Sequence, residues 1–231
     1  MAIGVRWPKK LIRMALVNAV NYCKSYNKQK IFCVGRNKTG TTSLEAALGE
    51  LGFVVGHQPT AEHLAHRHYF AGNFRALMTY CRCGQVFQDV PFSWPETYKH
   101  LDWAFPESKF ILTVRDDSEQ WYRSITRFHA KKFGSAGAVP TSDELKAAGY
   151  RRKGFMYNTV KVHGTSDSDP YNKAQLKAHY EQHNTQVIQY FRNRPDQLLV
   201  LNIASDDGYQ RLIDFLGERS SQTTFPWKNQ T

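Results

Sequence analysis

Residues 31–44, IFCVGRNKTGTTSL, join a short apolar run to a glycine-bearing loop and then to the start of a helical pattern. Four apolar residues that end at a glycine predict a buried strand over 31–34. Apolar residues then recur on one face of a helix, at Leu44, Ala47, Leu48 and Leu51. A strand, a glycine loop and a helix in this order predict an anion site, because the loop amides and the helix N-terminus both attract negative charge.

Four more short apolar runs follow this segment and alternate with helical patterns. They lie at 53–55, 86–87, 110–114 and 198–203. Strands that alternate with helices are typical of a parallel sheet with crossover helices. We therefore expect one α/β domain of the P-loop nucleotide-kinase-like kind, with about five parallel strands flanked by helices.

Two segments depart from this alternation. Residues 1–29 form a basic N-terminal helix or extension, and we expect residues 6–30 to pack on the domain rather than on a membrane surface. Residues 30–231 make up the domain itself. Within it, residues 132–172 contain five glycines and no strong apolar period. So long an irregular segment in a compact domain predicts a functional loop, and we interpret it as a lid over an acceptor site.

The composition limits the classes of partner. The 231 residues include 31 Lys and Arg against 20 Asp and Glu, a net charge of +11, which predicts an anionic ligand. The basic residues are spread along the chain without a recognition motif, which argues against a nucleic-acid binder. Four scattered cysteines are too few for a disulfide framework and favour a reduced, cytoplasmic protein. No metal is expected, because the histidines at 63, 66 and 68 lack a carboxylate or cysteine at ligand spacing.

The position of the loop lysine distinguishes two kinds of phosphate loop. A nucleoside-triphosphate loop reads G-x-x-x-x-G-K-[ST], with the lysine directly after the second glycine. Here Lys38 lies two places before Gly40. A P-loop nucleotide kinase or NTPase therefore stays as the alternative, in which Asp89 would be the magnesium carboxylate.

The run from Gly35 to Leu44 resembles the 5′-phosphosulfate-binding loop of the sulfotransferases, in the branch with a G-x-x-K-T-G-T-T-S-L pattern. Further blocks resemble the same family in the same order, at 87–92 (FQDVPF), 109–116 (KFILTVRD), 121–124 (WYRS) and over 183–226. The similarity covers about residues 30–227. It implies an enzyme that moves a sulfuryl group from 3′-phosphoadenosine-5′-phosphosulfate (PAPS) to a hydroxyl or amine of a small-molecule or glycan acceptor.

The resemblance and the charge of PAPS together assign a donor site. Lys38 is expected to meet the bridging oxygen as it becomes anionic. Arg36, Thr41, Thr42 and the loop amides are expected to hold the 5′-phosphate. Arg115 and Ser124 match the family positions that hold the 3′-phosphate, although Arg115 has an ion pair with Asp116 or Asp117 as its alternative. The complete candidate set for the donor is Arg36, Asn37, Lys38, Thr39, Gly40, Thr41, Thr42, Ser43, Arg115 and Ser124.

An acceptor hydroxyl or amine needs a base. Asp89 and His57 both follow predicted strands, at the edge where open α/β sheets bind their ligands. We favour Asp89, then His57, and His183 last. Between Arg115 and Ser124 the chain is one residue longer than the family pattern.

Overall fold

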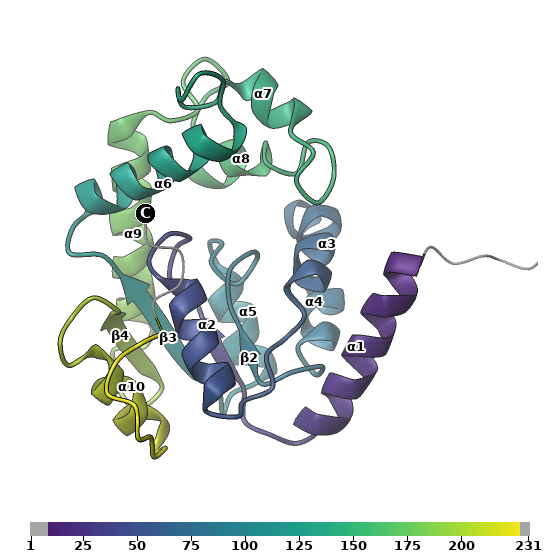
Figure 1. Cartoon of the computed structure of the whole chain (residues 1–231), viewed down its shortest axis with the longest axis vertical. Helices are drawn as coiled ribbons and strands as arrows, with labels where there is room; N and C mark the ends of the chain where they lie inside the picture. The colour runs from purple at the N-terminus through teal and green to yellow at the C-terminus, as the bar shows by residue number, and fades with distance from the viewer. Residues whose placement is uncertain (1–8, 227–231) are drawn as a thin grey trace, which may run out of the picture.

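A four-stranded parallel sheet lies at the centre of the computed structural model, which describes residues 9–226 (Figure 1). The strands are β1 (Ile31–Cys33), β2 (Val86–Phe87), β3 (Lys109–Val114) and β4 (Leu198–Asn202). Their order across the sheet is β2-β1-β3-β4, so β1 pairs in parallel with both β2 and β3. The central place of β1 brings the loop that follows it to the middle of the carboxyl edge.

The segment 53–55 does not form the strand that its apolar residues predict. Val55 alone forms a parallel bridge to Val86, and the carbonyl of Val54 accepts hydrogen bonds from the amides of Gln85 and Val86. The segment is short because Gly52 ends the preceding helix with a φ of 87°. The expectation of about five strands is thus one too high, although residues 53–55 lie where a fifth strand beside β2 would lie.

Helices cover both faces of the sheet, which confirms the α/β class. Because side chains alternate along a strand, Ile31 and Cys33 pack against α2 and α10, while Phe32 and Val34 face α3, α4, α5 and α9. The helices around the sheet are α1 (Lys9–Ser25), α2 (Thr41–Glu50), α3 (Gln58–His68), α4 (Arg75–Tyr80), α5 (Thr97–Ala104), α9 (Lys173–Tyr190) and α10 (Gly208–Leu216), with a 3₁₀ turn at Tyr69–Ala71.

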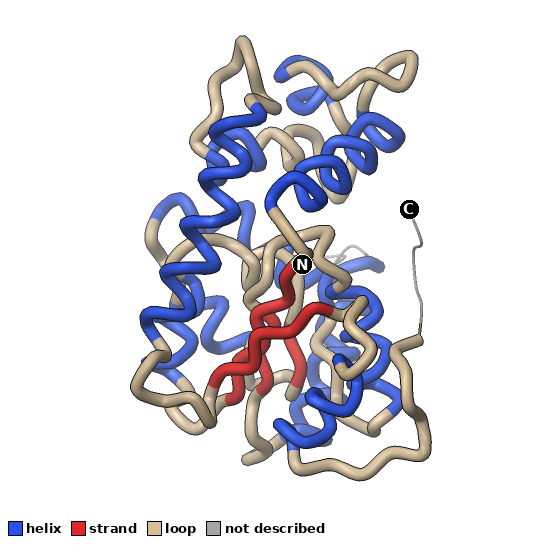
Figure 2. The backbone as a smooth tube through the Cα atoms, turned by 90° about the vertical axis from the view of Figure 1, so that its left-hand side faces the viewer, coloured by secondary structure: helices blue, strands red, loops and turns tan. Residues whose placement is uncertain are grey.

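A third layer, which we call the upper layer, lies beyond the carboxyl edge of the sheet (Figures 1 and 2). It consists of α6 (Ser118–Phe133), α7 (Ser142–Ala147), α8 (Asn158–His163) and the first half of α9, around a core of their own. The segment 132–172, which the sequence presents as irregular, therefore contains two short helices. A capping box between Thr141 and Glu144 begins α7.

Helix α1 runs beside α3 and α4 at the edge of the molecule (Figure 1). Met14 is buried there, and the Asn18 side chain donates a hydrogen bond to Thr60 in α3. Over residues 9–226, no helix is long and apolar enough to cross a membrane.

Candidate active site

The loop from Gly35 to Gly40 crosses the carboxyl end of β1, and its two glycines are fixed by close neighbours. A Cβ at Gly35 would lie 2.1 Å from Oγ1 and 2.4 Å from the carbonyl oxygen of Thr113 in β3. Gly40 has a φ of +95°, and a Cβ there would lie 2.9 Å from Cδ1 of Ile203. Lys38 also has a positive φ, of 71°. The loop thus has a defined shape that only these residue types allow.

The helix that follows the loop presents free amides at its start. Gly40 is the N-cap residue of α2, and no side chain caps the helix. The amides of Ser43 and Leu44 donate back to the carbonyl of Gly40 at 3.0 and 3.1 Å. The earlier amides, at Thr41 and Thr42, have no acceptor inside the helix. Together with the positive end of the helix dipole they make an anion site.

Lys38 places a cation beside this helix end. Its Nζ lies 4.2 Å from the ring centroid of Phe128 in α6, and its carbonyl accepts a hydrogen bond from Nε of Arg115 at 2.8 Å. Burial, and then the charge of Arg115, lower the pKa of Lys38, while Asp89 raises it. Within residues 9–226 Lys38 forms no ion pair, so this half-buried cation fits an anionic ligand.

Asp89 lies next to the loop, as expected for a residue that follows β2. Its Oδ1 accepts hydrogen bonds from the Asn37 side chain and from the amide of Val90 at 2.8 Å. Ser93 Oγ completes the group by donating to Oδ1 of Asn37 at 2.9 Å. Burial raises the pKa of Asp89, and these hydrogen bonds together with the charges of Arg151 and Lys38 oppose the rise. Asp89 is therefore a carboxylate with a raised pKa that is held to the loop through Asn37.

Arg36 and Thr39 hold the loop in place. The buried Arg36 guanidinium donates through Nη1 to the carbonyl of Ser93, and burial lowers its pKa to about 9. Thr39 Oγ1 bonds to the carbonyl of Arg36 and to Oγ1 of Thr113, both at 2.6 Å. The sequence assigned Arg36 to the 5′-phosphate; its described contact is instead with the segment that carries Asp89.

Arg115 follows β3 and has its Nη groups free among residues 9–226. The two neighbouring aspartates, which could have paired with it, have other partners. Asp116 accepts from Asn202 at 2.5 Å and from Gln120 at 2.8 Å, and Asp117 accepts from the amide of Gln120 at 2.6 Å as the N-cap of α6. The ion pair of Arg115 with Asp116 or Asp117, which the sequence left as an alternative, is thus not formed within residues 9–226.

Ser124 lies on the face of α6 that is turned toward the loop. Trp121, three residues earlier, donates through Nε1 to the carbonyl of Asn37 at 2.9 Å, and Phe128, four residues later, lies under Lys38. The buried Oγ of Ser124 has no hydrogen-bond partner among residues 9–226. An unpaired hydroxyl in this place fits a phosphate oxygen. The extra residue before Ser124 therefore leaves it beside the loop.

The other two candidate bases form no side-chain hydrogen bond to the loop among the described residues. His57 Nδ1 bonds to Oγ1 of Thr60 at 2.9 Å, and burial followed by the charges of Arg13 and Arg151 lowers its pKa. His183 is buried, and its Nε2 bonds to the carbonyl of Val34 at 2.8 Å. Of the three candidates, Asp89 alone is hydrogen-bonded to a loop side chain in the described structure.

A buried carboxylate that sequence reasoning did not single out ties the segment 132–172 to the sheet layer. Glu62 in α3 forms an ion pair with Arg151 and accepts a hydrogen bond from the hydroxyl of Tyr150 at 2.9 Å. Burial raises the pKa of Glu62, and Arg151 lowers it. The sequence signal that could have marked Glu62 as buried is its place directly after Ala61, on the apolar side of a helix.

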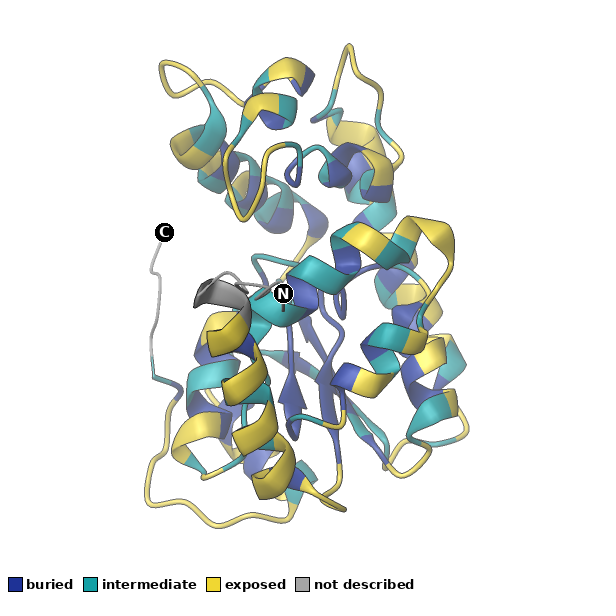
Figure 3. Ribbon diagram, turned by 90° about the vertical axis from the view of Figure 1, so that its right-hand side faces the viewer, coloured by how far each residue is buried: buried dark blue, intermediate teal, exposed yellow. Residues whose placement is uncertain are grey.

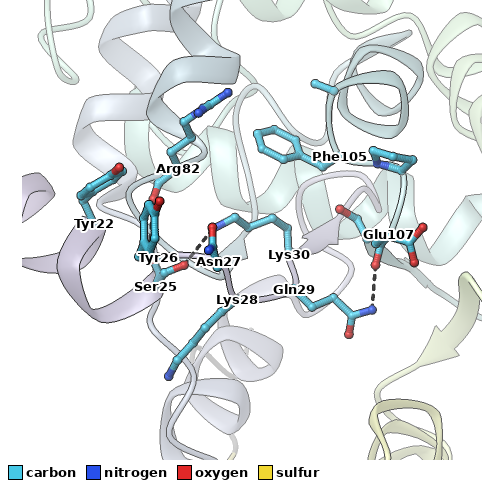
Figure 4. Close-up of a pocket in the computed structure, with 13 residues that line it drawn as sticks. Tyr22, Ser25, Tyr26, Asn27, Lys28, Gln29, Lys30, Arg82, Phe105 and Glu107 are labelled. Carbon is cyan, nitrogen blue, oxygen red and sulfur yellow. Dashed lines mark hydrogen bonds between the residues drawn. The ribbon is translucent and has the colours of Figure 1, made fainter.

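A separate pocket of about 460 Å³ opens at the opposite, amino end of the strands (Figure 4). Lys30, which precedes β1, lines it and donates through Nζ to the carbonyl of Gly84 at 2.6 Å. Gln29 donates to the carbonyl of Glu107 across the pocket at 2.7 Å. Since the loop follows β1 and Lys30 precedes it, this pocket is distinct from the candidate active site.

Comparison with known proteins gives the family. No curated protein matched the chain. In the part of the chain that the structure describes, no group of three or more His, Cys, Asp or Glu residues could hold a metal ion. A family model described as a sulfotransferase domain matches residues 30–231. The chain belongs to the sulfotransferase domain family, the enzymes that transfer sulfuryl groups.

Proposed function

We propose that the protein transfers a sulfuryl group from PAPS to a hydroxyl or amine of a small-molecule or glycan acceptor. The observation that carries the proposal is the position of Lys38. This half-buried lysine has no ion pair in the described chain, and it lies in the loop that leads into the uncapped start of α2. Asp89 is hydrogen-bonded to Asn37, the residue before Lys38. A cation and an anion site on one loop, with a carboxylate bonded to that loop, suit transfer from a leaving phosphate to a nucleophile that loses a proton.

Two anion-binding places match the two ends of the donor. The amides at the start of α2, with the hydroxyls of Thr41 and Thr42, would hold the 5′-phosphate. The free Nη groups of Arg115 and the unpaired hydroxyl of Ser124 would hold the 3′-phosphate. Arg36, Asn37, Thr39 and Ser43 would position the loop.

In the transfer, the acceptor oxygen or nitrogen bonds to sulfur while the bond from sulfur to the bridging oxygen of the 5′-phosphate breaks. Negative charge then grows on that oxygen, and Lys38 stabilises it. Asp89 takes the proton that the acceptor loses. Burial raises the pKa of Asp89, which makes it a stronger base than an exposed carboxylate. His57 would act as the base only if the acceptor approached from the side of α3.

The segment 132–172 would cover the acceptor. Its attachment to Glu62 brings Tyr150 and Arg151 toward α3, on the side of the loop where Asp89 lies. An aromatic ring and a cation here would meet the acceptor after the donor has bound. The four cysteines are free thiols, which agrees with a cytoplasmic protein.

Calorimetric titration with 3′-phosphoadenosine-5′-phosphate (PAP), the desulfated product, tests the proposal. We expect PAP to bind clearly more tightly than ATP with Mg²⁺, and Lys38→Ala to weaken PAP binding. Lys99→Ala is the matched control, because Lys99 is exposed and its ion pair with Glu96 lies at the surface. If PAP does not bind and ATP with Mg²⁺ does, the protein is a P-loop kinase or NTPase instead.

A further inference from the structure

Three polar side chains of helix α1 are turned toward the protein. Asn18 donates to Oγ1 of Thr60 at 3.2 Å, and Asn21 donates to the carbonyl of Val55 at 3.0 Å. Ser25 donates to the carbonyl of Arg82 at 3.2 Å. Surface helices ordinarily bury an apolar stripe and expose polar residues. In α1 three polar residues make hydrogen bonds to the domain, beside the buried Met14.

The opposite side of α1 is an exposed apolar stripe. Ile12, Leu16 and Val20 are 47%, 63% and 53% exposed, and they follow each other at intervals of four residues. Residues four apart lie on the same face of a helix, so the three side chains form one continuous strip. Cys23 is also exposed. Figure 3 shows α1 at the front of the molecule with this exposed side toward the viewer.

The chain around the stripe carries only basic charges in its sequence. Seven Lys or Arg residues and no Asp or Glu occur among the first 30 residues, and the first acidic residue of the chain is Glu45. Arg13 and Lys24, which are exposed, lie next to each other along one border of the stripe when the helix is viewed down its axis. Tyr22 and Tyr26 are 40% and 61% exposed near the end of the helix.

We propose that α1 docks the protein on the surface of an anionic lipid bilayer, with Ile12, Leu16 and Val20 inserted among the acyl chains. An apolar strip bordered by cations fits a layer whose headgroups are negative and whose interior is apolar. A second copy of the chain fits less well, since two helices of this kind would bring like charges together. Because α1 is too short and polar to cross the bilayer, it lies in the surface plane. Packing on the domain through Asn18, Asn21 and Ser25 leaves the stripe available for this contact.

The test is sedimentation of the full chain with phosphatidylcholine vesicles that contain or lack phosphatidylserine. We expect binding to the anionic vesicles that weakens with added salt, and little binding to the neutral ones. Leu16→Asp should weaken binding by at least about tenfold. Arg13→Glu and Lys24→Glu should each weaken it by about fivefold or more.

Ile188→Asp is the matched control, because Ile188 is 44% exposed on α9, away from α1. It should bind vesicles as the unchanged protein does, and equal melting temperatures would show that the variants are folded. The proposal fails if the unchanged protein does not bind anionic vesicles, or if Leu16→Asp and Ile188→Asp bind equally. Self-association in solution that Leu16→Asp abolishes, without vesicle binding, would assign the stripe to a second copy of the chain instead.

Discussion

The loop 35–40 and the proposed lid, residues 132–172, are held in different ways. The loop is bonded to two neighbouring segments, through Thr39 to Thr113 and through Arg36 to Ser93, and the space around Gly35 is filled by backbone. The lid is held by the contact of Arg151 and Tyr150 with Glu62 and by the packing of its apolar side chains on α6 and α9. Hydrogen bonds and close backbone neighbours thus fix the loop, whereas side-chain packing and one buried carboxylate hold the lid.

The largest effect is expected for Gly35→Ala. The new Cβ would lie 2.1 Å and 2.4 Å from atoms of Thr113 in the central sheet, which cannot move without breaking strand pairing. We expect a loss of about 4 kcal/mol or more in the free energy of unfolding, measured by urea denaturation. Gly149→Ala, in the lid, has open space around it and should change stability by less than about 1 kcal/mol. Equal losses at the two positions would contradict the contrast between loop and lid.

Arg115→Ala should weaken PAP binding by about thirtyfold, equal to about 2 kcal/mol, because charged hydrogen bonds to the 3′-phosphate are lost. Binding of 5′-AMP, which lacks that phosphate, should stay nearly unchanged. Arg123→Ala removes an exposed arginine from α6 and is the control. If both ligands weaken equally in Arg115→Ala, the residue supports the loop rather than the 3′-phosphate.

A buried histidine makes the upper layer sensitive to acid. Burial, and then the charge of Lys38, lower the pKa of His129 from 6.5 to about 4, and its Nδ1 bonds to the hydroxyl of Tyr171 at 2.6 Å. Between pH 6.5 and 4 the unfolded chain binds the proton and the folded protein does not, so stability falls as the pH falls. The loss is about 2 kcal/mol at pH 5 relative to pH 8.

His129→Phe should remove that part of the pH dependence, as followed by melting temperature from pH 8 to pH 5. His100→Phe is the control, since His100 is exposed on α5. An unchanged pH dependence in His129→Phe would show that other groups cause the acid loss.

The smallest effect is expected for Glu62→Gln, which keeps the hydrogen bond from Tyr150 but removes the charge that pairs with Arg151. We expect amide hydrogen exchange in residues 150–156 to become about fivefold faster, equal to about 1 kcal/mol, with no change in the loop. Glu218→Gln, at an exposed site after α10, should have no effect on either segment. Faster exchange in the loop as well would mean that loop and lid open together.

The sequence predicted the loop and the sheet because their signals are local. The apolar runs at 31–34 and 110–114 are bounded by glycine or charge, and the strand, loop and helix order is found as expected. The prediction of a fifth strand was wrong because residues 53–55 lie between Gly52 and Gly56. So short a segment forms a single bridge, from Val55 to Val86. The sequence could place Lys38, Asp89 and Ser124 at the same edge of the sheet, because each lies in a segment that follows a parallel strand.

The lid was beyond sequence reasoning because its structure depends on distant contacts. Helices α7 and α8 have six residues each, too few for a visible apolar period, and they are held by packing on α6 and α9. The capping box at Thr141 and Glu144 was a signal that could have marked α7. Nothing local marks the pairing of Glu62 with Arg151, 89 residues away along the chain.

The role of Lys38 in stabilising the leaving oxygen can be measured by the release of PAP from PAPS. The assay would follow release with a panel of phenols, sugars and amines, using the unchanged protein, Lys38→Ala and Lys99→Ala. We predict that at least one acceptor accelerates release, that Lys99→Ala matches the unchanged protein, and that Lys38→Ala is slower by about 100-fold to 1000-fold. Equal rates for Lys38→Ala and the unchanged protein would show that Lys38 does not stabilise the leaving oxygen.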